Sequence, residues 1–172
     1  MRLTICATFA AAIVLLTAGC GTQGGASRPA PRDTVKVFYV NPERFTDFTV
    51  QNRDVQNSQN VFTGEVMGAL TPVMLSRFPG SRLTLRFRDI DLAGRRAPVR
   101  GRSVRIIRRS SPARLLFDYL LQDSSGRALA SGSQKLVDTA PQTLADNPAR
   151  SQAGRRESRM LERWLSSLSI NR

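Results

Sequence analysis

The sequence predicts an α+β domain built on a single antiparallel sheet of about five strands, with two helices packed on one face of that sheet. Three features of the chain support this fold class. Apolar and polar residues alternate along several short segments, as they do in strands with one buried face. Two other segments repeat their apolar residues at helical spacing. Turn-forming residues separate these segments, and a composition of 41% hydrophobic and 23% charged residues is typical of a globular domain.

The first half of the predicted domain contains a strand followed by a long helix. Residues 35–40 are β-branched and aromatic, which favours a strand, and residues 45–48 are expected to form a short irregular edge. The apolar spacing of residues 58–78 predicts a helix with Ser58 as its N-cap. We expect Pro72 to bend or weaken this helix and the following Pro-Gly pair to end it.

The second half is expected to supply the remaining strands. Residues 82–88 alternate Arg or Thr with Leu or Phe, which predicts a strand with one face in water. Residues 93–101 are expected to form a loop, and residues 104–107 a further strand. The segments 115–122 and 128–137 are predicted to pair as a hairpin around a turn of Asp, Ser and Gly.

A second helix is predicted to close the domain. Asn147 and Pro148 are expected to open it, because proline is favoured in the first turn of a helix. Trp164 is interpreted as a core residue rather than as an anchor for a partner. The apolar residues that should pack on the sheet are Met160, Leu161, Trp164, Leu165 and Leu168.

The first twenty residues have the pattern of a bacterial export signal. Arg2 precedes an apolar segment, residues 5–16, which is too short to span a bilayer core of roughly 30 Å. Leu-Thr-Ala-Gly-Cys at 16–20 resembles the lipobox of bacterial lipoproteins. This resemblance implies removal of residues 1–19 and attachment of acyl chains to Cys20. Ordinary secretory cleavage beside an unmodified cysteine is the alternative.

The segment after the cysteine is predicted to be a tether. Residues 20–34 are rich in Gly, Pro, Ser and Ala, so they are expected to join the lipid anchor flexibly to a single domain at 35–172. Gly21 stands where an Asp would favour retention in the inner membrane. We therefore expect a protein anchored by lipid in the outer membrane and facing the periplasm.

Charge and composition narrow the possible functions. Lys and Arg total 26 against 13 Asp and Glu, and every cation except Lys36 and Lys135 is an Arg. The net charge of +13 suggests an anionic neighbour, although a basic surface without a ligand also fits. The chain has no His, and both cysteines lie in the first twenty residues. These absences exclude Ser-His and Cys-His nucleophile pairs and a Cys/His metal site in the domain. We therefore expect no cofactor and no enzymatic activity.

The segment 95–114 is the candidate anion-binding site. It contains eight Arg and no Asp or Glu, and guanidinium groups bind phosphate and carboxylate with paired hydrogen bonds. Arg105, Arg108 and Arg109 are singled out as its binding residues. The expected partners are anionic lipid, lipopolysaccharide or peptidoglycan rather than nucleic acid, because no aromatic-interleaved motif accompanies the basic residues. The alternative is a solvated loop whose charge discourages edge-to-edge aggregation.

Carboxylates near the end of the 82–88 strand form a second candidate site. Asp89 and Asp91 would share a face with Phe87 if the pleat stayed regular. Together they offer a hard cation site or an acid/base pair, to which an enzyme could add Asp118. The alternative is that they cap the following turn or pair with one of the many Arg side chains.

Several segments of the chain resemble the domain of unknown function 3016. The most specific is Arg-Asp-Ile-Asp-Leu-Ala-Gly at 88–94. The start of the domain at 35–47, the turn at 123–126 and Met-Leu-Glu-Arg-Trp at 160–164 are also similar, so the resemblance covers roughly residues 35–168. The chain departs from the family pattern before the last segment, where Arg-Arg-Glu stands in place of a Glu-Lys lead-in. The resemblance implies export in bacteria and supplies no catalytic residues.

Together these observations predict a cell-envelope lipoprotein of unknown molecular role. It is expected to act as a non-catalytic binding or assembly accessory with a basic face for anionic envelope components. A purely structural lipoprotein is one alternative. A carboxylate-based envelope hydrolase using Asp89, Asp91 and Asp118 is another.

Overall fold

The computed structural model describes residues 34–50, 53–106, 111–138 and 154–170. Within them, strands and helices follow one another in the order β-α-β-β-β-β-α, with one short 3-10 turn, η2, after the first strand. The elements are β1 (Val35–Tyr39), η2 (Pro42–Arg44), α1 (Val55–Arg77), β2 (Arg82–Asp91), β3 (Arg95–Val99), β4 (Arg102–Ile106), β5 (Arg114–Gln122), β6 (Ala128–Val137) and α2 (Arg155–Ser167).

Four strands form the main sheet in the order β1-β2-β5-β6, and β3 and β4 form a separate two-stranded sheet. β1 runs parallel to β2, whereas the other neighbours are antiparallel. The α+β class is confirmed, but the prediction of a single antiparallel sheet of about five strands is wrong. α1 carries the chain back to the start of β1, which makes β2 parallel to it. Apolar alternation along a strand does not encode the direction of its neighbour.

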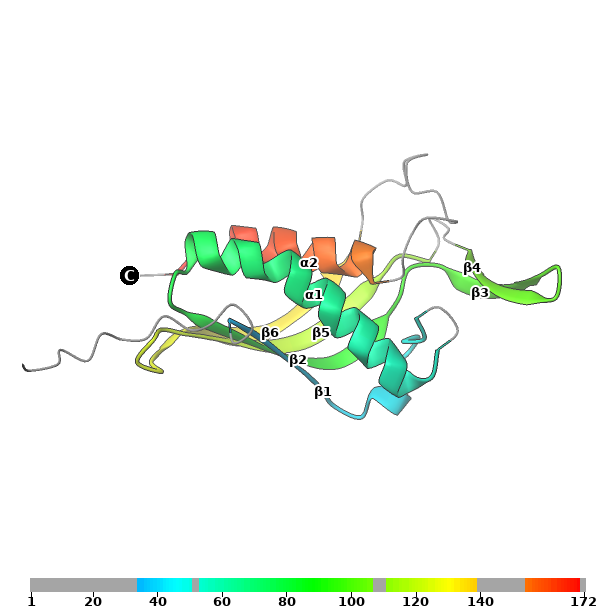
Figure 1. Cartoon of the computed structure of the whole chain (residues 1–172), viewed down its shortest axis with the longest axis horizontal. Helices are drawn as coiled ribbons and strands as arrows, with labels where there is room; N and C mark the ends of the chain where they lie inside the picture. The colour runs from blue at the N-terminus through cyan, green and yellow to red at the C-terminus, as the bar shows by residue number, and fades with distance from the viewer. Residues whose placement is uncertain (1–33, 51–52, 107–110, 139–153, 171–172) are drawn as a thin grey trace, which may run out of the picture.

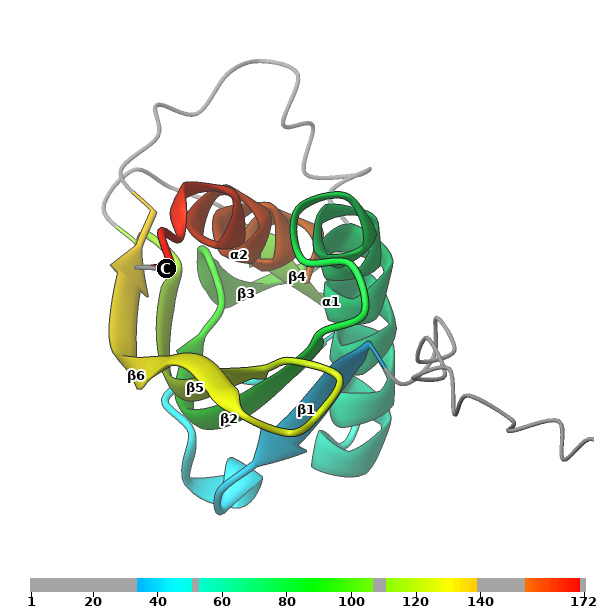
Figure 2. The ribbon, with the colours of Figure 1, turned by 90° about the vertical axis from the view of Figure 1, so that its left-hand side faces the viewer.

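Both helices lie on the same face of the main sheet, as the sequence predicts (Figure 1). Seen from the end of the molecule, the sheet twists around the core and leaves its other face without a helix (Figure 2). No helix among the described residues is long and apolar enough to cross a membrane.

The two helices begin at other residues than predicted. α1 starts at Val55 because Asp54 caps it, accepting a hydrogen bond of 2.7 Å from the backbone N–H of Asn57. Ser58 is instead buried inside the helix, where its hydroxyl accepts from the backbone N–H of Val50. α1 continues through Pro72 and ends at Arg77.

α2 starts at Arg155, later than predicted, and Gly154 serves as its N-cap. Asn147 and Pro148, which were expected to open this helix, lie outside the described residues.

The predicted hairpin of β5 and β6 is confirmed, and its register pairs Phe117 with Gln134. The predicted loop at 93–101 is wrong, because β3 occupies residues 95–99 and pairs with β4. Arg100 and Gly101 form the turn between them, with φ of 49° and 76°. Two adjacent positive φ angles match the twist of a tight hairpin. The hairpin projects away from the main sheet, so its sequence lacks a buried face and reads as a loop (Figure 1).

A continuous apolar core fills the space between the sheet and the helices. Alternate residues of β2 and β5 point into it, including Leu83, Leu85 and Phe117, all fully buried. Phe87 and Phe62 of α1 meet edge to face with ring centroids 5.5 Å apart. Trp164 is only 9% exposed and meets Phe117 at 5.0 Å, so its predicted core position is confirmed.

Leucine truncations on the two faces of the sheet test this arrangement. Leu85→Ala should lower the free energy of unfolding by about 2–5 kcal/mol, because it leaves a cavity in a closely packed core. Leu120→Ala removes the same atoms from the outer face of the neighbouring strand, where the side chain is only half-buried, and should cost clearly less. Urea denaturation followed by Trp164 fluorescence measures both. Equal losses of unfolding free energy in the two variants would mean that the faces of the sheet are assigned wrongly.

Candidate functional site

The β3–β4 hairpin presents part of the predicted basic segment to solvent. Arg95, Arg96 and Arg100 are exposed, and no Asp or Glu occurs between Arg95 and Ile106. Arg96 donates one hydrogen bond of 3.3 Å to the carbonyl of Thr49. The hairpin projects from the body of the domain, as Figure 1 shows, and these three arginines are exposed on it.

Arg105, on the same hairpin, is turned inward. Its guanidinium forms two hydrogen bonds of 2.8 Å with the carboxylate of Asp47, and its side chain is only 14% exposed. Nη2 also donates to the carbonyl of Thr49 at 3.2 Å. Nη1 lies within 3.4–3.5 Å of three consecutive carbonyl oxygens, those of Leu92, Ala93 and Gly94.

Because Arg105 already occupies its donors within the fold, we draw the candidate anion-binding surface without it. Arg108 and Arg109, its predicted companions, lie outside the described residues. Among the hairpin side chains whose exposure is described, the exposed arginines are Arg95, Arg96 and Arg100.

The turn that Arg105 contacts is also held from the other side, by Glu157 of α2. One carboxylate oxygen of Glu157 accepts from the backbone N–H of Ala93 at 2.9 Å, and the other accepts from Gly154 at 3.1 Å. Glu157 is 2% exposed, and burial raises the pKa of its carboxyl, opposed by these hydrogen bonds and by Arg105. Residues 92–94, at the end of the motif, are therefore the place where β2, the β3–β4 hairpin and α2 meet. We call this place the polar joint.

Sequence reasoning missed Glu157 and Asp47. A signal for Glu157 was present, because it falls on the same helical stripe as Leu161, Trp164 and Leu168. A charged residue on an apolar stripe is buried and needs a partner. No comparable pattern marks Asp47, which lies in an irregular segment joined to β2 by an isolated bridge to Asp91.

The candidate carboxylates Asp89, Asp91 and Asp118 have different partners. A register shift between Phe87 and Asp89 takes Asp89 off the core-facing side of β2 that Phe87 occupies, so the regular pleat that would place the two on one face is absent there. Asp89 accepts from the N–H and the hydroxyl of Thr46, at 2.8 and 2.9 Å. In the described part of the chain, no group of three potential metal-ligating side chains is found.

The two other candidate carboxylates have separate surroundings. Desolvation raises the pKa of Asp91, and the negative charges of Asp47 and Asp89 raise it further. The positive charges of Arg114 and Arg95 oppose this shift. Asp118 lies on the outer face of β5, where Arg88 pairs with it at 3.2 Å and Ser133 donates to it at 2.6 Å. Asp118 is therefore an ion-pair partner of Arg88 on the outer face of the sheet.

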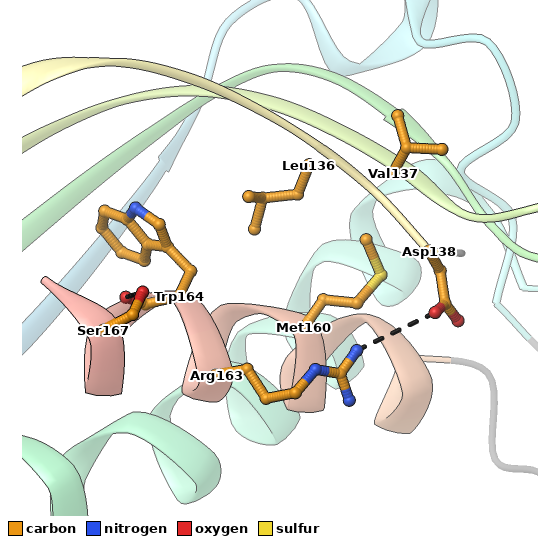
Figure 3. Close-up of a pocket in the computed structure, with 7 residues that line it drawn as sticks. All are labelled: Leu136, Val137, Asp138, Met160, Arg163, Trp164 and Ser167. Carbon is orange, nitrogen blue, oxygen red and sulfur yellow. Dashed lines mark hydrogen bonds and ion pairs between the residues drawn. The ribbon is translucent and has the colours of Figure 1, made fainter. Parts of the chain in front are cut away.

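A shallow groove of about 630 Å³ lies between β6 and α2 (Figure 3). Its apolar lining includes Met160 and Trp164, which point toward the strand. Asp138 at one end is buried and pairs with Arg156 and, at 3.8 Å, with Arg163. The single carboxylate in this groove is thus engaged by cations, and the lining is suited to apolar contact.

Comparison with known proteins identifies the family. The model of a family described as "Protein of unknown function (DUF3016)" matches residues 33–167. The chain belongs to the DUF3016 family. No curated protein matches this DUF3016 chain.

Among solved structures, a PelC dodecamer from Paraburkholderia phytofirmans is similar at 13% identity and a TM-score of 0.32, covering 84% of this chain and 95% of that one. A substituted variant of the same dodecamer gives 12% identity and a TM-score of 0.29 over the same shares of the two chains.

The burial of Glu157 leads to a pH prediction. A carboxyl whose pKa is raised by folding contributes stability at pH values below its unfolded pKa, and loses that contribution as the pH rises through its folded pKa. Glu157→Gln removes this titration. The free energy of unfolding of the wild type minus that of Glu157→Gln should therefore fall as the pH rises above the ordinary pKa of a glutamate.

Urea unfolding at each pH measures this difference. Glu162→Gln, on the exposed side of the same helix, is the matched control and should show no such trend. A wild-type advantage that grows with pH would mean that Glu157 is stabilised as a carboxylate.

Proposed function

We propose that this DUF3016 chain is a lipid-anchored, non-catalytic protein of the bacterial cell envelope that binds an anionic component through its β3–β4 hairpin. The observation that carries the proposal is the exposed group of Arg95, Arg96 and Arg100 on a projecting hairpin without a carboxylate. Exposed charges add little to folding stability, so the fold itself does not account for this group.

The anchor is supported by the first twenty residues. A positive start, a short apolar segment and a lipobox-like ending at Cys20 form an export and lipidation signal. Two or three acyl chains hold a protein stably on a membrane, whereas one chain does not. Gly21 favours the outer membrane, so the domain would face the periplasm.

The ligand class follows from the chemistry of arginine. Planar guanidinium groups form paired, charge-assisted hydrogen bonds with phosphate and carboxylate groups. Phosphate-bearing envelope lipids, either phospholipid or lipopolysaccharide, offer such groups at high density beside a lipid-anchored protein. Peptidoglycan carboxylates are the competing ligand.

The partners of the aspartates favour a binding role over a carboxylate-based hydrolase. Asp89 is held by Thr46 and Asp118 by Arg88, and Arg114 lies opposite Asp91 on β5. Asp138 pairs with two arginines. An acid/base pair needs two carboxyls at one cleft, with their pKa values shifted apart. The groove of Figure 3 contains one carboxylate, Asp138, and an apolar lining.

The anchor is tested by Cys20→Ser in the bacterial host. We expect an unprocessed precursor that incorporates no labelled fatty acid, because the thiol that carries the lipid is gone. Precursor size on a gel and the lipid label are the measurements. Mature-sized, soluble protein from this variant would rule out lipid anchoring and favour ordinary secretory cleavage.

Anion binding is tested by removing three hairpin charges together: Arg95→Gln, Arg96→Gln and Arg100→Gln. Co-flotation of the full chain with phosphatidylglycerol vesicles, and its binding to lipopolysaccharide, should weaken about 10-fold or more at low salt, and the difference should shrink as salt rises. The matched control removes three exposed arginines elsewhere, Arg44, Arg53 and Arg159. Equal losses in the two triple variants would mean that only net charge matters and that the hairpin is a solvated surface.

A further inference from the structure

We propose that the face of the main sheet opposite the helices is a second binding surface, which lies flat against a bilayer containing anionic phospholipid. This inference rests on one part of the proposed function, the lipid anchor that keeps the chain beside a membrane. It does not depend on binding by the hairpin. Figures 1 and 2 show both helices on the other side of the sheet, so the described residues leave this face uncovered. We call it the open sheet face.

The strand registers place its side chains in rows. One row runs across all four strands through Lys36, Thr84, Leu120 and Ser131. The next runs through Phe38, Arg86, Asp118 and Ser133. Arg82 and Arg88 extend the face along β2, and Lys135 extends it along β6. Alternate residues of the same strands point into the core.

The charge of the open sheet face is strongly positive. Its five cations Lys36, Arg82, Arg86, Arg88 and Lys135 are all exposed and outnumber its carboxylates. Asp89 shares a row with Leu116 and Lys135, and its carboxylate is held by Thr46. Arg88 pairs with the carboxylate of Asp118 at 3.2 Å. The other four cations have no ion-pair partner among the described residues. Asp91 follows at the end of β2, where the cation Arg114 of β5 is its Cα partner.

Unpaired like charges on neighbouring strands repel one another, and the fold gains nothing from holding them together. A surface that supplies many negative charges in one plane removes this repulsion. The headgroup layer of an anionic bilayer is such a surface, and it attracts each Lys or Arg held near it.

Apolar side chains lie between the cations. Phe38 is 52% exposed, the most exposed large apolar side chain described, and its Cα partner on β2 is Arg86. Leu116 and Leu120 are half-buried on the same face of β5. Aromatic and aliphatic groups surrounded by Lys and Arg favour the interfacial layer of a membrane, where acyl chains begin below the phosphates.

The place of the anchor agrees with this orientation. β1 carries Lys36 and Phe38 and begins at Val35, directly after the predicted tether at 20–34. A chain of this length reaches at most about 50 Å when fully extended. The strand of the open sheet face that is nearest the anchor in sequence, β1, is therefore the strand that carries the exposed Phe38.

The test uses the full chain with two kinds of variant. The triple variant Lys36→Gln, Arg86→Gln and Lys135→Gln removes three cations from three strands. The triple Arg44→Gln, Arg53→Gln and Arg159→Gln is the control of equal charge. Co-flotation is measured with phosphatidylglycerol-containing and with phosphatidylcholine vesicles. The extra binding to the anionic vesicles is the charge-dependent part, because the apolar residues 5–16 contribute to both. The face variant should lose about 10- to 100-fold of this extra binding, and the control clearly less.

Phe38→Trp places a reporter on the same face. Its fluorescence, after subtraction of the wild-type signal from Trp164, should shift to shorter wavelength with the anionic vesicles, because the ring leaves water. Urea unfolding of each variant confirms that the fold is kept, and a variant that fails this check is replaced by the single changes Lys36→Gln and Lys135→Gln.

The outcomes separate the two proposals. If anionic vesicles capture no more wild-type chain than neutral ones but lipopolysaccharide still binds, the bilayer proposal is overturned and the hairpin proposal stands. If neither ligand is bound beyond the neutral control, the proposed function fails as well. If anionic vesicles bind but the face variant equals the control and the fluorescence of the Phe38→Trp reporter does not shift, the open sheet face is not the contact surface.

Discussion

The pairing of Arg105 with Asp47 is the interaction on which the arrangement of the domain depends. Its two hydrogen bonds of 2.8 Å join the projecting hairpin to the irregular segment that follows β1. The same guanidinium lies over the carbonyl groups of the 92–94 turn, and Glu157 holds the N–H of Ala93 on that turn. Elements distant in the chain thus meet at one polar joint. A partly buried charge with a bidentate partner stabilises such a joint, whereas removal of either partner leaves the other desolvated.

The arginines of the domain differ in burial and in their partners. Arg105 and Arg156 have buried or half-buried guanidinium groups paired with aspartates, and they hold the fold together. The exposed cations of the hairpin and of the open sheet face outnumber the carboxylates on these surfaces and add little to stability. An excess of exposed cations beside a predicted lipid anchor is the basis for the proposed binding to anionic envelope lipid. Arg105 joins the base of this hairpin to the segment that follows β1.

Much of the fold could be predicted from the sequence, because burial imposes periodicity. The β5–β6 hairpin, the apolar face of β2 and the core position of Trp164 all follow from spacing alone. The parallel pairing of β1 and the separate β3–β4 sheet could not be predicted, since strand direction and a hairpin without a buried face leave no periodic signal. The candidate site was harder still. Among eight arginines in one segment, nothing local distinguishes Arg105, whose partner lies 58 residues earlier.

Amide hydrogen exchange in an Arg105→Gln variant tests most directly whether this pair holds the joint. The N–H of Leu92 donates to the carbonyl of Asp47, and the N–H of Ala93 donates to Glu157. The account predicts that both amides exchange much faster in Arg105→Gln, while amides in the middle of β5 change only by the common factor set by global stability. Arg95→Gln on the same hairpin should leave all of them unchanged. Unaltered protection of Leu92 and Ala93 in Arg105→Gln, or a uniform change across the sheet, would contradict it.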